Sequence, residues 1–111
     1  MVAKYIPDRG DLIWLQFSPQ TGHEQSGQRP AIVLSPKAYN GKVGLAISCP
    51  VTDQQKGYPF EVKLPDSSGV EGVILADQVK SLDWGKREAQ FIEHATESVL
   101  NETLGKIRTL L

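Results

Sequence analysis

The chain has 111 residues, with 12 Lys and Arg, 13 Asp and Glu, and a formal net charge of −1. This length supports one hydrophobic core, so we expect residues 1–111 to form a single domain. The balanced charge argues against a purely electrostatic nucleic-acid binder, because such binding depends on an excess of basic side chains. A local groove lined by a few Lys and Arg is still compatible with it.

Cysteine content and the start of the chain bear on its compartment. The single cysteine, Cys49, cannot form an internal disulfide, and we interpret it as a buried strand residue. No group of Cys and His has the spacing of metal ligands, so we expect no metal ion and no cofactor. The first ten residues include Lys4, Asp8 and Arg9, so no long apolar stretch follows Met1. We therefore expect a cytoplasmic protein without a signal peptide or a membrane span.

The first third of the chain predicts two strands and a loop. Residues 11–17 alternate in hydrophobicity and predict a strand, whereas residues 18–28 lack aliphatic side chains and predict a long exposed loop. A second strand is expected over residues 30–34, with Pro30 in its first position. Ser35 is then expected to cap a helical turn over residues 36–40.

The remaining pattern predicts short strands and one closing helix. The expected strands cover residues 45–52, 60–64 and 72–79, with weaker candidates at 81–84 and 87–92. Thr96 is the expected N-cap of a C-terminal helix whose apolar face carries Leu100, Leu104, Ile107 and Leu111. We interpret Trp14 and Trp84 as packing residues. The fold class is therefore mainly β, a small and strongly bent sheet or barrel, for which an SH3-like barrel is the best candidate.

The loop before the second strand gathers reactive side chains between two glycines. His23, Glu24 and Gln25 follow Gly22, and Arg29 stands where the chain re-enters a strand. Cleavage of RNA without a metal needs a base, an acid and a cation for the phosphorane, which His, Glu and Arg can supply. A solvated turn with a surface ion pair is the alternative interpretation of the same residues.

A second candidate region combines a cation with an aromatic ring. Lys56 and Tyr58 flank a glycine, and such a pair suits phosphate contact and base stacking on single-stranded RNA. A hairpin tip with a half-buried tyrosine is the alternative. Gln78 and Lys80 are further candidates for RNA contact.

Together these motifs resemble the MazF/PemK toxin family, the sequence-specific mRNA interferases, nearly end to end. The matching segments are Tyr5-x-Pro7-Asp8-x-Gly10-Asp11-Leu12-Ile13-Trp14, residues 22–30, Ser35-Pro36-x-x-Tyr39-Asn40, Pro50-x-Thr52, and residues 56–62 and 75–81. The resemblance implies an SH3-like barrel of the CcdB/MazF/Kid type with a C-terminal helix. It also implies the toxin of a type II toxin–antitoxin system, which inhibits translation and growth by cutting mRNA.

The resemblance also assigns roles to residues of the reactive loop and the strand after it. The family's catalytic arginine falls on Arg29 and its catalytic threonine on Thr52. Arg29 would stabilise the phosphorane and is a candidate donor of the leaving-group proton, and Thr52 would hydrogen-bond a phosphate oxygen. Glu24 matches an acidic position implicated in activity and is a candidate base or positioning group. His23 resembles the histidine of the Kid/PemK branch, whereas the MazF branch tends to have serine there.

One position departs from the Kid-like pattern. Asp77 lies where Kid-like toxins place a catalytic aspartate, but the arginine two residues before it is replaced here by Leu75. A Kid-like Asp–Arg pair therefore cannot operate. We expect Asp77 to contact an RNA base or to support its strand.

Family resemblance further implies a homodimer with single-stranded RNA across its interface. A cognate antitoxin with an acidic, disordered C-terminal segment would wrap the dimer and block the RNA. The main alternative is the gyrase poison CcdB, which shares the fold, binds a protein and depends on a Trp-Gly-Ile type of ending. This chain has the reactive loop and ends Arg108-Thr109-Leu110-Leu111, which favours the nuclease. An SH3-like module without activity is the third interpretation.

Overall fold

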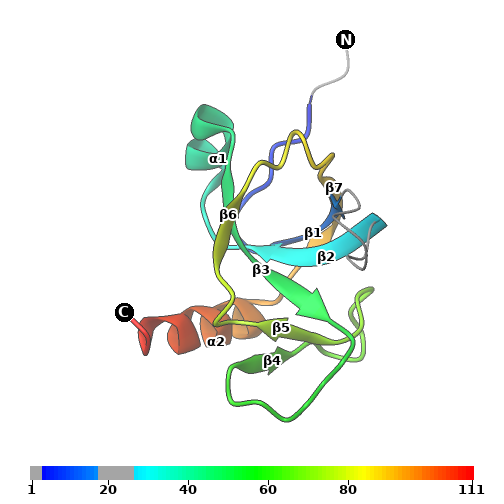
Figure 1. Ribbon diagram of the computed structural model, residues 1–111, viewed down its shortest axis with the longest axis vertical. Coiled ribbons are helices and arrows are strands. Elements are labelled where there is room, and N and C mark those ends of the chain that lie inside the picture. The colour runs from blue at the N-terminus through cyan, green and yellow to red at the C-terminus, as the bar shows by residue number, and fades with distance from the viewer. Residues whose placement is uncertain (1–3, 18–26) are drawn as a thin grey trace, which may run out of the picture.

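Seven strands and two helices make up the computed structural model, which describes residues 4–17 and 27–111 (Figure 1). The strands are β1 (Asp11–Phe17), β2 (Gly27–Val33), β3 (Ala46–Thr52), β4 (Glu61–Lys63), β5 (Val73–Leu75), β6 (Lys80–Leu82) and β7 (Gln90–His94). The helices are α1 (Lys37–Val43) and α2 (Glu97–Arg108). None of the described helices is long and apolar enough to cross a membrane.

All strand pairs are antiparallel, and the sheet order is β4-β5-β3-β2-β1-β7. β3 changes its partner along its length, because its first half pairs with β6 and its end pairs with β5. The sheet therefore bends at β3, and α2 lies beside β4 and β5 (Figure 1). This arrangement confirms the predicted mainly β fold with a C-terminal helix.

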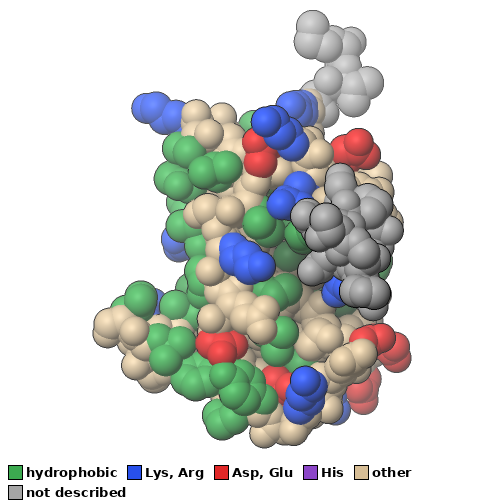
Figure 2. Space-filling view, in the orientation of Figure 1, with side chains coloured by type: hydrophobic (Ala, Val, Ile, Leu, Met, Phe, Trp, Pro, Cys, Tyr) green, Lys and Arg blue, Asp and Glu red, His purple; other side chains and the backbone are tan. Residues whose placement is uncertain are grey.

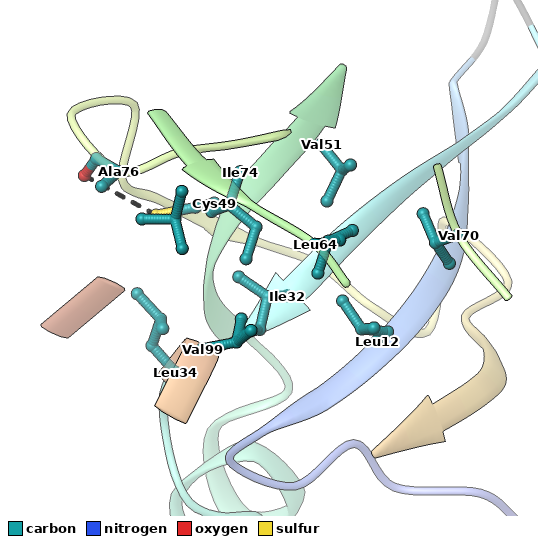
Figure 3. Packing of buried hydrophobic residues seen from close by; sticks show 11 residues of the cluster. Leu12, Ile32, Leu34, Cys49, Val51, Leu64, Val70, Ile74, Ala76 and Val99 are labelled. Atoms are coloured by element: carbon teal, nitrogen blue, oxygen red, sulfur yellow. Dashed lines mark hydrogen bonds between the residues drawn. The ribbon is translucent and has the colours of Figure 1, made fainter. Parts of the chain in front are cut away.

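The two central strands bury side chains on both faces. Leu12 of β1 belongs to the core cluster that α2 covers through Val99, whereas the next residue, Ile13, belongs to a second cluster closed by Trp84. Burial on both faces explains why consecutive residues of β1 are apolar. Cys49 is completely buried in the first cluster, where its Sγ lies 3.8 Å from the carbonyl oxygen of Ala76 (Figure 3). The predictions for Cys49 and Trp84 as packing residues are confirmed.

The C-terminal helix begins where the sequence predicts. The Thr96 side chain accepts a hydrogen bond from the Val99 N–H at 3.2 Å, which confirms it as the N-cap. Leu100, Leu104 and Ile107 pack against the first core cluster. The prediction for Leu111 is wrong, because the helix ends at Arg108 and Leu111 is 96% exposed.

The region around the first helix differs from the prediction. α1 is longer than the expected turn, and its N-cap is Pro36, without a side-chain cap. Ser35 does not cap it, because its hydroxyl donates to Asn40 and accepts from the Ile47 N–H at 2.8 Å. Asp8 supplies the missing acceptor instead, at 2.8 Å from the Lys37 N–H.

Several predicted strand ends also shift. β2 begins at Gly27, so Pro30 lies inside the strand rather than in its first position. The β2–β3 pairing ends at Ala31, which leaves β2 as an edge on that side, where a proline is tolerated. β4 and β5 are shorter than predicted, with three residues each. The weaker candidates at 81–84 and 87–92 only overlap β6 and β7, which cover Lys80–Leu82 and Gln90–His94.

Candidate active site

A cleft of about 420 Å³ opens where β2 and β3 leave their common ladder. Its walls come from three parts of the chain that are distant in sequence: the β1–β2 pair, the end of β3, and the segment before β5. The lining residues are Trp14, Gln28, Arg29, Pro30, Val51, Thr52, Asp53, Gly69, Val70 and Glu71. The cleft therefore unites Arg29 and Thr52, the two residues to which the sequence resemblance gives the central roles.

Strand register helps explain why these two residues border one cleft. Ala31 of β2 and Pro50 of β3 form the last opposite pair of their ladder, and Arg29 and Thr52 each lie two residues beyond it. Residues two apart in a strand project on the same face, so both side chains belong to the face of Ala31 and Pro50. The Thr52 hydroxyl accepts a hydrogen bond from the Gln54 N–H at 3.2 Å, which leaves its own proton available for another acceptor. Cation and hydroxyl donor thus border one space, which suits an anionic phosphate.

Gly72 holds the end of β3 at close range. A Cβ at this position would lie 2.1 Å from the carbonyl oxygen of Thr52, and its φ of +119° favours glycine. Only a residue without a side chain lets the segment before β5 approach Thr52 so closely. The position of Thr52 in the cleft therefore depends on Gly72.

The cleft also contains residues that the sequence did not identify. Asp53 and Glu71 add two exposed carboxylates near Arg29, and Trp14 is half-buried in the wall rather than enclosed in a core. Adjacency to Thr52 was the available signal for Asp53. Nothing in the local sequence marks Glu71, because it reaches the cleft through the folding of a distant segment onto β3. The loop candidates His23, Glu24 and Gln25 lie outside the described residues.

The second candidate region is a loop after β3 that is fixed at several points. The Glu61 carboxylate accepts the backbone N–H groups of Lys56, at 2.9 Å, and Gly57, at 3.1 Å. Lys106 of α2 donates to the carbonyl oxygens of Pro59 and Glu61. These contacts order the loop, so it presents Lys56 on a defined backbone.

Tyr58 and Asp77 come together in this region. The Tyr58 hydroxyl donates a hydrogen bond to Asp77, and this bond raises the pKa of the tyrosine above its usual value. The other carboxylate oxygen of Asp77 is buried without a partner among the described residues. Tyr58 itself is 45% exposed, which leaves its ring accessible. Gln78 and Lys80 are exposed nearby in sequence, and none of these four residues lines the cleft of Arg29 and Thr52.

Comparison with known proteins gives consistent matches over most of the chain. Residues 8–111 match the family model of the PemK-like, MazF-like toxin of type II toxin–antitoxin systems. The endoribonuclease toxin MazF of Escherichia coli K12 is 58% identical over 91 residues, which cover 80% of this chain and 79% of that protein. The endoribonuclease toxin ChpB of the same strain is 36% identical, with 100% of this chain and 99% of that protein covered.

A solved structure gives the same result for the fold. A crystal structure of MazE–MazF from Deinococcus radiodurans superposes with a TM-score of 0.92 at 57% sequence identity. The match covers 96% of this chain and 96% of that chain. The likeness therefore extends over almost the whole described fold.

Proposed function

Because the chain belongs to the family of PemK-like, MazF-like toxins of type II toxin–antitoxin systems, it is an endoribonuclease toxin, and we propose that it cuts single-stranded RNA at the cleft of Arg29 and Thr52. The observation that carries this proposal is the convergence of a permanent cation and a hydroxyl donor from neighbouring strands on one cleft. The similar proteins are named endoribonucleases, which argues against the CcdB-like alternative and against an inactive module.

The reaction we propose needs only side chains and the RNA itself. A base removes the proton from the 2′-hydroxyl, and the oxygen attacks the adjacent phosphorus. The bond to the 5′-oxygen then breaks, and that oxygen receives a proton from an acid. The products are a 2′,3′-cyclic phosphate and a 5′-hydroxyl end. Arg29 stabilises the phosphorane charge, and Thr52 donates a hydrogen bond to a phosphate oxygen.

Three carboxylates and one imidazole are available for the proton transfers. Glu24 and His23 keep the roles that the sequence gives them, as candidate base or acid. Asp53 and Glu71 join them as candidates, because both border the cleft with Arg29. Lys56, Tyr58, Asp77, Gln78, Lys80 and Gln25 are proposed to contact the RNA outside the scissile bond, with Tyr58 supplying a base-stacking surface.

We further propose a homodimer formed through an apolar groove. This groove of about 470 Å³ lies between α1, β3 and α2, and it is lined by Arg9, Leu34, Ser35, Pro36, Tyr39, Ile47, Val79, Leu104, Ile107 and Leu111. Hydrophobic side chains follow the left side of Figure 2, from α1 to α2, and Lys and Arg side chains are spread over the upper and middle part of the same face. Exposed apolar surface of this kind marks sites of protein association.

The antitoxin is proposed to be a short protein with an acidic, disordered C-terminal segment. The MazF of Deinococcus radiodurans forms a complex with MazE, which supports a cognate partner for this chain as well. We place the single domain of residues 1–111 in the cytoplasm, where mRNA is accessible.

Analysis of product ends tests the proposed reaction. A long defined RNA is incubated with the protein, with and without EDTA, and the ends are identified by mass spectrometry. We expect 2′,3′-cyclic phosphate and 5′-hydroxyl ends with EDTA present. A second RNA with a 2′-deoxynucleotide on the 5′ side of the cut should not be cleaved there, because it lacks the attacking hydroxyl. Products with 5′-phosphate ends, or a strict need for a divalent ion, would contradict the reaction.

A further inference from the structure

Glu93 of β7 holds one wall of the cleft without lining it. One oxygen of its carboxylate accepts the Ser68 hydroxyl at 2.8 Å, and the other accepts the Gly69 N–H at 2.8 Å. Ser68 Oγ in turn accepts the Val70 N–H at 3.1 Å. The carboxylate is thus tied, directly or through one hydroxyl, to three consecutive residues at the start of the wall formed by residues 69–71.

A β-bulge brings Glu93 to this place. Glu93 is opposite Leu12 of β1, but the next residue of β1, Ile13, is opposite Phe91, so β7 contains one extra residue. Bulges redirect side chains and increase the local twist of the strand. Glu93 therefore shares the face of Leu12, which is the face that Val70 covers in the first core cluster.

Gly69 fits the Glu93 carboxylate closely. A Cβ at this position would lie 2.9 Å from a Glu93 carboxylate oxygen, which is shorter than any ordinary contact of a Cβ. The wall has two further attachments, because Val70 is only 4% exposed and Gly72 lies directly against Thr52. Only the Glu93 attachment is a side-chain interaction that substitution can remove without opening the core.

We propose that Glu93 is a positioning residue for RNA cleavage, fixing the 69–71 wall opposite Arg29 and Thr52 so that the scissile phosphate is held in line for attack. This inference rests on the proposed endoribonuclease function. Glu93 acts through the wall and does not touch the RNA. Release of the wall lets the substrate shift, and a displacement of about 1 Å can lower the rate of a positioned reaction by about 100-fold.

Two substitutions break the same contact from opposite sides. Glu93→Ala removes the carboxylate, and Gly69→Ala displaces it by steric contact with the end of a flexible side chain. For each variant we expect kcat on a defined RNA to fall by about 10- to 100-fold, with little change in KM, because misplacement affects attack more than binding. The double variant should be no slower than the slower single variant, because both changes release one contact.

Two further variants separate positioning from general stability. Glu93→Gln retains an acceptor for Gly69 and a donor for the Ser68 hydroxyl, so it should recover most of the kcat. Ser67→Ala removes a hydroxyl from the same segment that has no hydrogen bond among the described residues, and it should cut like the wild type. Thermal unfolding of every variant is measured first. The kinetics are then compared at a temperature at which all the variants are folded.

The outcomes are distinct. Three results would overturn the positioning role. They are a wild-type kcat in Glu93→Ala, an increase in KM without a fall in kcat, and a kcat of the double variant that is lowered by the product of the two single effects. A wild-type protein that cuts no RNA would instead overturn the proposed function, and this inference with it.

Discussion

Single candidate residues depend on neighbours that lie far from them in the sequence. Thr52 is an ordinary strand residue by its local sequence, and it becomes a candidate ligand of phosphate because Gly72 packs against its carbonyl oxygen. Tyr58, outside the cleft, similarly depends on Asp77, whose carboxylate accepts a hydrogen bond from the Tyr58 hydroxyl and so raises the pKa of the tyrosine. The chemistry of each side chain is therefore set by a partner distant in sequence.

Cys49 provides a residue-scale prediction. Burial, with a smaller effect from the charge of Asp77, raises the pKa of its thiol to about 12. The native protein at pH 8 should therefore resist iodoacetamide, because the reactive species is the thiolate, and the unfolded protein should react. Mass spectrometry of the alkylated protein measures this directly. Rapid modification of the native protein at pH 8 would contradict the buried placement.

The same shift predicts how stability responds to alkali. An unfolded thiol ionises near a pKa of about 8.5, but the native thiol stays protonated until much higher pH. The unfolded state is therefore increasingly favoured as the pH rises above the pKa of the unfolded thiol. The free energy of unfolding is measured in urea at pH 7 and at pH 10. It should fall more between these pH values for the wild type than for Cys49→Val, which has no thiol to ionise.

At the scale of elements, the start of α1 depends on a distant acceptor. The helix has no side-chain cap of its own, and Asp8 accepts the Lys37 N–H in its place. Backbone hydrogen bonds from Lys37 and Arg9 also lower the pKa of Asp8. The segment before β1 is thereby joined to the start of α1.

Replacement of Asp8 tests this cap. Asp8→Ala should lower the free energy of unfolding by about 0.5–2 kcal/mol at pH 7, the usual cost of a lost cap. Asp8→Asn, which keeps an acceptor, should lose less. Asp66 is exposed, and its carboxylate accepts no hydrogen bond from the described residues, so Asp66→Ala should lose little. Because the native pKa is lowered, the benefit is present above the unfolded pKa of about 3.9 and disappears as pH falls below it. Equal stability of Asp8→Ala and wild type at pH 7 would contradict the cap.

Elements with strong local patterns were predictable, and those set by distant contacts were not. The apolar stretch of β1 and the Thr96 cap of α2 are local signals, and the strand over residues 11–17 and the cap are both confirmed. Ser35 and Pro36 also form a typical helix start, but Ser35 instead bonds Asn40 and Ile47, which lie close to it only in the folded chain. For the cleft, family resemblance pointed to Arg29 and Thr52. Their proximity depends on strand register and on the 69–71 wall, neither of which local sequence reveals.

At the scale of the whole molecule, the proposed active-site cleft and the apolar groove are separate surfaces. The cleft of Arg29 shares no residue with the apolar groove that contains Tyr39 and Val79, so association through the groove leaves the cleft open. A homodimer formed in this way would carry two clefts. Its RNA surface would then extend beyond what one small domain offers.

A charge in the groove tests the dimer. Val79 is 40% exposed, and Val79→Asp introduces a carboxylate that would be desolvated on association. Sedimentation at micromolar concentration should show a dimer for wild type and a shift to monomer for this variant. Phe91→Asp, at an exposed apolar residue on β7, should sediment like wild type. A monomeric wild type would contradict the homodimer, and an unaffected Val79→Asp dimer would contradict this interface.

The central claim is that this toxin cuts RNA at the cleft of Arg29, and the cleavage rate of Arg29→Ala tests it most directly. The rate on a defined single-stranded RNA is measured for the wild type, Arg29→Ala and Arg108→Ala, which removes an exposed arginine at the end of α2. We predict that Arg29→Ala stays folded but cuts about 10²- to 10³-fold more slowly, because the phosphorane loses its main charged donor. Arg108→Ala should match wild type. Cleavage by Arg29→Ala at the wild-type rate would contradict the assignment of the active site to this cleft.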